Sequence, residues 1–225
     1  MTTEKQIEIH FQKSCELRDA YWNNLGKPDP DVISHLINPA FMGGPAWPSL
    51  RQAFKTIRRE SSTIVASDGL SDPFDEPENE EEASYNGFGL EFYAESPGNI
   101  ESVKDSWQFD LVYQISQFAA QNANIQPMLR EMKVLTSELY DVRVPDEWKN
   151  AEDRVGIILG ITSKSIPESV QLSLETIDIV NVKLLTIKEL EYVIENGAEG
   201  RGKLAELFMK EENPTYSSLD RKSLV

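Results

Sequence analysis

The sequence predicts an α+β fold in which mixed or antiparallel sheets are flanked by helices. Two observations lead to this prediction. Segments with helical periodicity are interspersed with runs rich in Val, Ile and aromatic residues along the 225-residue chain. These runs do not follow the strand–helix–strand rhythm of a doubly wound parallel sheet. We expect one compact unit, in which residues 1–42 form a helix and linker that pack on a domain of residues 43–225.

The chain is expected to begin with a helix and to continue into an irregular stretch. Residues 3–25 place apolar side chains at i, i+4 steps, which is typical of an amphipathic helix. The sequence Gly-Lys-Pro-Asp-Pro at residues 26–30 ends that helix. The prolines and glycines between residues 38 and 49 exclude long regular structure there.

The next segment, residues 51–67, is ambiguous. Leu50, Phe54 and Ile57 fit one face of a helix, whereas residues 62–65 have strong β propensity. A hairpin with a short turn near Glu60 also fits, and we choose the hairpin.

The middle of the chain predicts a strand and then a long helix. Residues 87–94 are rich in aromatic side chains and predict a strand. Residues 106–121 predict the clearest helix of the chain. Ser106 is a good N-cap, and an apolar stripe follows it. The stripe consists of Trp107, Leu111, Ile115 and Phe118.

The C-terminal part predicts two more strands, a helix and a polar tail. Residues 155–161 and 170–182 are rich in Ile, Val and Leu and predict two strands of a sheet. Residues 186–195 predict a helix with a Thr186–Glu189 capping box. The glycines of residues 197–203 break this helix before a last short one, and residues 213–225 are expected to be extended.

The composition limits the kinds of partner. The net charge of -16 argues against nucleic acid and against anionic membrane surfaces, because both carry the same sign. Cys15 is the single cysteine, which favours a reducing cytoplasm. The N-terminal residues lack the apolar core of a signal peptide, and no stretch approaches the length of a membrane span.

Metal, nucleotide and nucleophile motifs are weak. The chain has two histidines, His10 and His35, and their spacing from Cys15 does not suit a zinc site. Gly87-Phe88-Gly89 lacks the third glycine and the following helix of a dinucleotide site. Residues 197–203 resemble a phosphate loop only superficially, because Leu204 stands where Ser or Thr is needed. We therefore expect no cofactor, no metal and no catalytic residue.

An acidic segment lies between two glycine-containing signatures. Residues 72–82 contain seven acidic side chains and no basic one. Pro73 and Pro77 do not suit a calcium loop, and a solvated, self-repelling loop is the simplest interpretation. Its charge also suits steering of a cationic partner by long-range attraction that salt screens.

The order of several short motifs carries a resemblance to a known family. Gly69-Leu70-Ser71-Asp72 is followed by Gly87-Phe88-Gly89-Leu90-Glu91, by a helix that Trp107 leads, by Gly200 and Gly202 before Leu204, and by Asp220-Arg221. This string, over residues 43–225, resembles the suppressor-of-fused-like domain. The resemblance implies an α+β fold with mixed sheets and no known cofactor.

The resemblance also implies a function. Animal members of the family are non-enzymatic and sequester a transcription factor by clasping a peptide as an added β-strand. Bacterial single-domain members act as immunity proteins that neutralise toxins, often nucleases. This chain has about the length of one lobe of the animal protein, and no second lobe is evident.

We therefore expect a non-enzymatic, protein-binding domain, and three functions remain open. The first is an immunity protein that blocks a cationic toxin domain. The second is a scaffolding or peptide-binding module that sequesters a cellular partner by β-augmentation. The third is an enzyme whose site is assembled from Asp72, Glu91 and other carboxylates. The partner-binding candidates are Asp72, Phe74, Asp75, Glu76, Glu78 and Glu91.

The other residues of the motif string have simpler structural interpretations. Gly69 and Gly89 suit a positive φ or a close backbone approach. Trp107 suits a buried anchor for its helix. Asp220 and Arg221 suit an ion pair that fixes the C-terminal segment. The candidates for such structural roles are Gly69, Leu70, Ser71, Gly87, Phe88, Gly89, Trp107, Gly200, Gly202, Asp220 and Arg221.

Overall fold

The computed structural model of the chain describes residues 3–73, 85–122 and 124–225. The α-helices are α1 (Thr3–Leu25), α2 (Trp107–Gln121), α3 (Ile125–Met132) and α4 (Ile187–Phe208). The strands are β1 (Lys27–Pro28), β2 (Ile33–Ser34), β3 (Ala53–Arg58), β4 (Ser62–Asp68), β5 (Leu90–Pro97), β6 (Leu135–Leu139), β7 (Val155–Leu159), β8 (Ser169–Gln171) and β9 (Thr176–Leu184).

The strands form one mixed sheet. Its order is β1-β3-β4-β5-β9-β7-β6, with β2 paired to β3 and β8 paired to β9. The pairs are antiparallel except for β5 and β9, which run parallel, with Leu90 opposite Asp178 and Tyr93 opposite Asn181. The predicted α+β class with a mixed sheet is confirmed.

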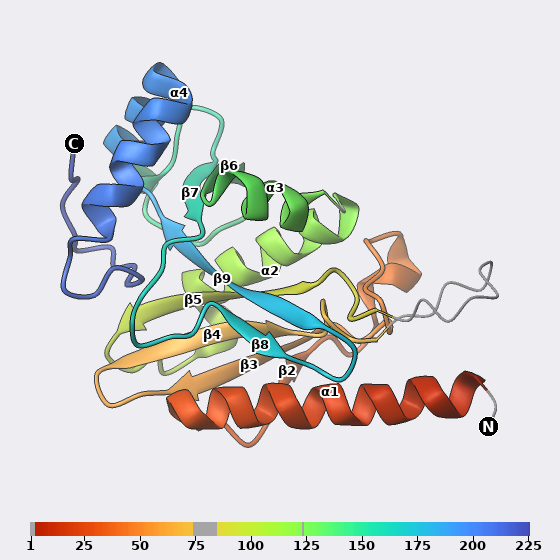
Figure 1. The fold of residues 1–225 in the computed structure, drawn as a ribbon. Helices are drawn as coiled ribbons and strands as arrows, with labels where there is room; N and C mark the ends of the chain where they lie inside the picture. Colours follow the sequence, from red (N-terminus) through yellow and green to blue (C-terminus); the bar gives the residue numbers. More distant parts are fainter. Residues whose placement is uncertain (1–2, 74–84, 123) are drawn as a thin grey trace.

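Helices cover both faces of the sheet (Figure 1). α1 lies along one face, where Tyr21 and Trp22 pack against Ile57, Ile64 and other apolar side chains of the strands. α2 lies on the opposite face within a larger apolar cluster. Successive side chains of a strand point to opposite faces of the sheet, so residues of β3, β4 and β5 contribute to both clusters.

α4 and the C-terminal segment close one end of the molecule. Thr186 caps α4 in a capping box with Glu189, as the sequence predicts. Gly197 has φ 55° and ψ −134°, so the helix is kinked there and then continues to Phe208. The glycines at positions 200 and 202 are therefore helical, and the predicted break is confined to Gly197.

Several predicted elements are confirmed. The helix at residues 3–25, the hairpin of β3 and β4 and the Ser106-capped α2 all form. The alternative helical face at Leu50, Phe54 and Ile57 does not form, since Phe54 and Ile57 lie on opposite faces of β3.

Three predictions need correction. Residues 170–182 hold β8, a turn and part of β9 instead of one strand. Residues 87–89 form a turn before β5, because Gly87 and Gly89 adopt positive φ angles. Trp107 is only half-buried and Phe118 is 42% exposed, so the buried stripe of α2 is centred on Leu111 and Ile115.

None of the described helices is long and apolar enough to cross a membrane. The domain boundary at residues 42 and 43 remains a prediction.

Candidate functional site

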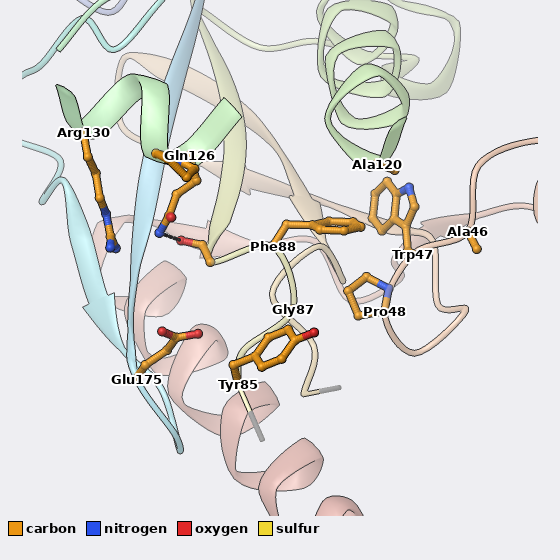
Figure 2. A pocket seen from close by; sticks show the side chains of 12 residues that line it. Ala46, Trp47, Pro48, Tyr85, Gly87, Phe88, Ala120, Gln126, Arg130 and Glu175 are labelled. Atoms are coloured by element: carbon orange, nitrogen blue, oxygen red, sulfur yellow. Dashed lines mark hydrogen bonds between the residues drawn. The ribbon is translucent and has the colours of Figure 1, made fainter. Parts of the chain in front are cut away.

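A pocket of about 640 Å³ lies beside the turn that precedes β5 (Figure 2). Trp47, Pro48 and Phe88 form an apolar wall on one side, and Arg130 and Glu175 lie on the other. Apolar contact area combined with a few polar groups is typical of binding sites. The residues that line the pocket are Ala46, Trp47, Pro48, Tyr85, Gly87, Phe88, Gly89, Ala120, Gln126, Pro127, Arg130 and Glu175.

Backbone contacts hold the Gly87–Gly89 turn in place. The N–H of Phe88 donates to the carbonyl of Leu70 at 2.8 Å, which joins this turn to the Gly69–Asp72 turn. Gly87 has φ 52°, and a Cβ at this position would lie 2.2 Å from the carbonyl oxygen of Leu70. Only glycine fits here without a shift of the backbone.

Helix α3 and the turn between β8 and β9 complete the pocket. The side chain of Gln126 donates to the carbonyl of Gly89 at 3.2 Å (Figure 2). The Nε of Arg130 donates to Asp178 at 2.8 Å. Glu175, in the turn between β8 and β9, accepts from the N–H of Asn86 at 2.8 Å. This side of the pocket is therefore held by contacts to two segments, namely β9 and the turn at residues 86–89.

The acidic segment leads into this site at its C-terminal end. Residues 74–84 join Pro73 to Tyr85, and Tyr85 lines the pocket. The predicted partner-binding residues Phe74, Asp75, Glu76 and Glu78 lie outside the described residues.

The structure corrects the prediction for Asp72 and Glu91, because both side chains are completely buried. The Nη2 of Arg18 donates to Asp72 at 2.6 Å. The carboxylate of Glu91 accepts from the N–H groups of Gly69 and Ser71, each at 3.0 Å. The conformation that the structure describes therefore presents neither carboxylate to a partner.

These carboxylates belong to a buried ion cluster centred on Arg18. The guanidinium of Arg18 contacts Asp68 at 2.9 Å, Asp72 at 2.6 Å and Glu91 at 3.8 Å, and its own exposure is 0%. Burial alone would raise the pKa of Asp68, but Arg18, Arg51 and Lys55 hold it well below its usual range. The cluster is charged and internally neutralised, which suits a structural role.

The ion cluster also explains why the Gly69–Asp72 motif and the Gly87–Glu91 motif occur together, because residues of both motifs bond to each other within it. Ser71 donates its hydroxyl to Glu91 at 2.7 Å and accepts from Arg18 at 2.9 Å. Gly69 has φ 149°, and a Cβ there would lie 2.2 Å from the carbonyl oxygen of Arg51. The expectation of a close backbone approach at Gly69 is confirmed.

Asp72 and Glu91, the carboxylates that the sequence suggests for an enzymatic site, are both buried and paired. Within the described ranges, no group of three His, Cys, Asp or Glu side chains is arranged to hold a metal ion.

The remaining motif residues lie far from the pocket in the chain and have separate roles. Gly200 is buried in α4, and a Cβ at Gly202 would meet no atom within 4 Å. Arg221 pairs with Glu189 at 2.7 Å instead of with Asp220, which is exposed. The predicted Asp220–Arg221 pair is therefore replaced by a pair that joins the C-terminal segment to α4.

Sequence reasoning missed Arg18, Trp47, Arg130 and Glu175. Arg18 stands on a helix that also carries many exposed charges, so its burial leaves no local signal. Trp47 lies in the irregular stretch and is only 2% exposed. Arg130 and Glu175 reach the pocket through tertiary contacts that no short motif encodes.

A second feature is the free edge of the sheet at β6. Among the described strands, β6 pairs with β7 alone. A cavity of about 300 Å³ lies beside it, lined by Phe118, Met128 and residues of β6 and β7. Phe118 and Met128 are 42% and 44% exposed. An edge strand with an adjacent apolar cavity is suited to pairing with an extended segment.

Comparison with solved structures identifies the fold. A structure described as the Sufu-Fu complex crystal structure has a TM-score of 0.57 and 12% sequence identity, over 95% of this chain and 91% of that chain. The crystal structure of Drosophila Suppressor of Fused has a TM-score of 0.51 and 15% identity, over 86% of this chain and 46% of that chain. No protein-family model and no curated protein matches the chain.

Proposed function

We propose that this chain, which has a suppressor-of-fused-like fold, is a non-enzymatic, cytoplasmic protein-binding domain that acts as an immunity protein against a cationic toxin domain. The pocket beside the Gly87–Gly89 turn carries the proposal, because it combines an apolar wall with fixed charged groups. The first similar solved structure is described as a complex of Sufu with Fu, which supports a protein partner.

Charge indicates the chemistry of that partner. The net charge of -16 favours a basic surface and opposes nucleic acid. Residues 74–84, which connect to Tyr85 at the pocket, contribute six acidic side chains. A nuclease toxin is basic where it holds phosphate, so an acidic inhibitor can occupy that surface and associate quickly at low salt.

The pocket further indicates what the partner inserts. An apolar or aromatic side chain fits the wall formed by Trp47, Pro48 and Phe88. A lysine or arginine next to that side chain would lie near Glu175. We expect the contacting segment of the toxin to combine one large apolar residue with basic neighbours.

The test is rescue from toxicity. A gene that lies next to the gene of this chain and encodes a basic toxin domain is expressed in cells with and without the chain. Growth of the cells and co-purification of the two proteins are then measured. Ala120→Trp should abolish rescue, because Ala120 lines the pocket and the added indole would fill it. Gln121→Trp is the matched control, since Gln121 is exposed and does not line the pocket.

The association rate of the purified pair should fall by about tenfold or more between 20 and 200 mM salt. Rescue that persists in Ala120→Trp would exclude the pocket as the contact. If no adjacent basic domain is bound or neutralised, the immunity function is wrong.

A second candidate is a scaffolding module that sequesters a cellular partner by β-augmentation. The free edge of β6 and its apolar cavity favour this function, because backbone pairing supplies affinity and the cavity can hold a side chain. Hydrogen exchange of the complex separates the two candidates. Strand addition should slow exchange in β6, whereas pocket binding should slow it at residues 85–89.

A further inference from the structure

The central parallel strands diverge and leave a notch in the sheet. β5 and β9 pair from Leu90 and Asp178 to Tyr93 and Asn181. Beyond that point β9 pairs with β7, starting at Val182, while β5 continues beside β4. Residues 214–217 of the C-terminal segment occupy this notch, which we call the β5–β9 notch. Tyr216 forms a parallel bridge with Glu95 of β5.

The β5–β9 notch binds the backbone of this segment. The ammonium of Lys183 donates to the carbonyls of Pro214, at 2.8 Å, and Tyr216. The side-chain amide of Asn181 donates to the carbonyl of Thr215 at 3.3 Å. Three successive carbonyls are thus held by side chains of one strand. This mode of recognition is independent of the bound sequence.

Two hydroxyl groups add sequence preference. Thr215 donates its hydroxyl to the carboxylate of Glu95 at 2.6 Å. The hydroxyl of Ser217 accepts from the N–H of Leu184 at 3.0 Å, and the N–H of Ser217 donates to the carbonyl of Glu95 at 2.8 Å. Both side chains are almost completely buried. The residue between them, Tyr216, reaches Ser61 at the surface.

The connection that leads from α4 into the segment is exposed, whereas Arg221, beyond the segment, bonds to Glu189. Residues 209–213, which connect α4 to the segment, are all exposed. The Oδ1 of Asn181 is buried and has no hydrogen-bond partner among the described residues. A ligand that supplied a donor there would remove the cost of that unsatisfied acceptor.

We propose that the β5–β9 notch is a binding site for an extended peptide with hydroxyl residues on either side of an aromatic one, and that residues 214–217 are its internal ligand. A matching segment of another polypeptide, such as the C-terminal segment of a second copy, can take their place. This site is separate from the pocket at Gly87–Gly89 and does not depend on the immunity function.

The test uses the full chain with a protease site inserted between Glu212 and Asn213. After cleavage, a labelled synthetic peptide of residues 213–225 is added in excess, and its exchange with the native segment is followed by fluorescence anisotropy. We expect the cleaved protein to stay folded and the labelled peptide to bind at the notch.

Peptide variants test the contacts without altering the fold of the protein. The Thr215→Val peptide should bind about tenfold more weakly, because the Oε2 of Glu95 loses the donor that Thr215 supplies, while Arg59 and Ser62 still bond only to Oε1. The Ser218→Ala peptide is the control and should bind within about twofold of the parent, since Ser218 bonds only within its own segment.

Two results would overturn the proposal. Unfolding of the protein on cleavage would make residues 214–217 an inseparable part of the core. Failure of the labelled peptide to exchange, or equal binding of the Thr215→Val and parent peptides, would show that the notch does not act as a peptide site.

Discussion

At the scale of single residues, Arg18 connects three parts of the chain. It projects from α1 into the sheet and pairs there with Asp68 and Asp72, while Glu91 lies 3.8 Å from its guanidinium. The planar guanidinium binds several oxygens at fixed angles, which a lysine ammonium does not do. The acidic positions at 72 and 91 that the sequence suggests for a partner are thus satisfied inside the protein.

Arg18→Met should lower the free energy of unfolding by about 3 to 5 kcal/mol, because the buried carboxylates lose their fully buried counter-charge, and Arg51 and Lys55 lie only at the edge of the cluster. Urea denaturation monitored by tryptophan fluorescence measures the change. Lys13→Met on the same helix removes an exposed pair with Glu16 and should change stability by less than about 1 kcal/mol. Equal effects of the two variants would contradict a structural role for the cluster.

Lys183 makes a prediction about pH. Burial, assisted by Arg221, lowers its pKa from 10.5 to about 8, and Glu211, Glu189 and Arg221 are the charged groups that face it. Between these two values the unfolded chain binds more protons than the folded one, so this lysine makes stability rise with pH.

Lys183→Met removes that contribution. The stability of the wild type relative to the variant should therefore increase by roughly 1 to 3 kcal/mol from about pH 7.5 to about pH 10. Urea titrations at each pH give the difference, in which the tyrosines common to both proteins cancel. Parallel pH profiles would show that Lys183 keeps an ordinary pKa in the folded protein.

At the scale of elements, the sequence predicts those helices and strands that are determined by interactions between residues close together in the chain. The capped helix after Ser106, the β3–β4 hairpin and the Thr186 capping box depend on neighbours within a few residues, and all three form. The parallel pairing of β5 with β9 depends on distant contacts and could not be predicted locally. The same is true of Trp107, which stays half-buried while Trp22, in a weakly amphipathic helix, is fully buried.

Of the predicted partner-binding residues that the structure describes, Asp72 and Glu91, neither lines the pocket, whereas Gly87, Phe88 and Gly89 line it but were predicted in structural roles. Phe88 and its glycines could be found from the sequence because their turn needs special backbone angles. The far wall, with Arg130 and Glu175, depends on how α3 and the β8–β9 turn are placed by the sheet. No periodicity within these segments carries that information.

Two glycine substitutions compare a tight turn with a helix. Gly69→Ala should lower the free energy of unfolding by more than about 2 kcal/mol, because the new Cβ meets the backbone of Arg51 at a φ of 149°. Gly202→Ala should be neutral or stabilising by up to about 1 kcal/mol, since it lies in α4 with open space around it. Thermal denaturation by circular dichroism compares both with the parent, and a neutral Gly69→Ala would contradict the turn geometry.

At the scale of the whole molecule, the charge of -16 acts on the protein itself as well as on partners. Like charges repel one another across the surface, and added salt screens that repulsion. Raising sodium chloride from 10 to 150 mM should therefore increase the melting temperature by about 2 to 4 °C, which corresponds to about 1 kcal/mol for a chain of this size. Calorimetry measures the shift. A decrease would mean that exposed ion pairs outweigh the net repulsion.

The parallel pairing of β5 with β9 also sets the order in which the chain can fold. Residues 98–175 separate these strands, so a long loop must close before the centre of the sheet exists. Folding rates fall as the sequence separation of native contacts grows, because closing a loop costs entropy before the contacts form. The β3–β4 hairpin can form early, and its apolar side chains then remain exposed until β9 joins the sheet. A newly synthesised molecule would therefore be most prone to aggregation while its sheet is incomplete. A chaperone would have to act in this interval, before β9 pairs with β5.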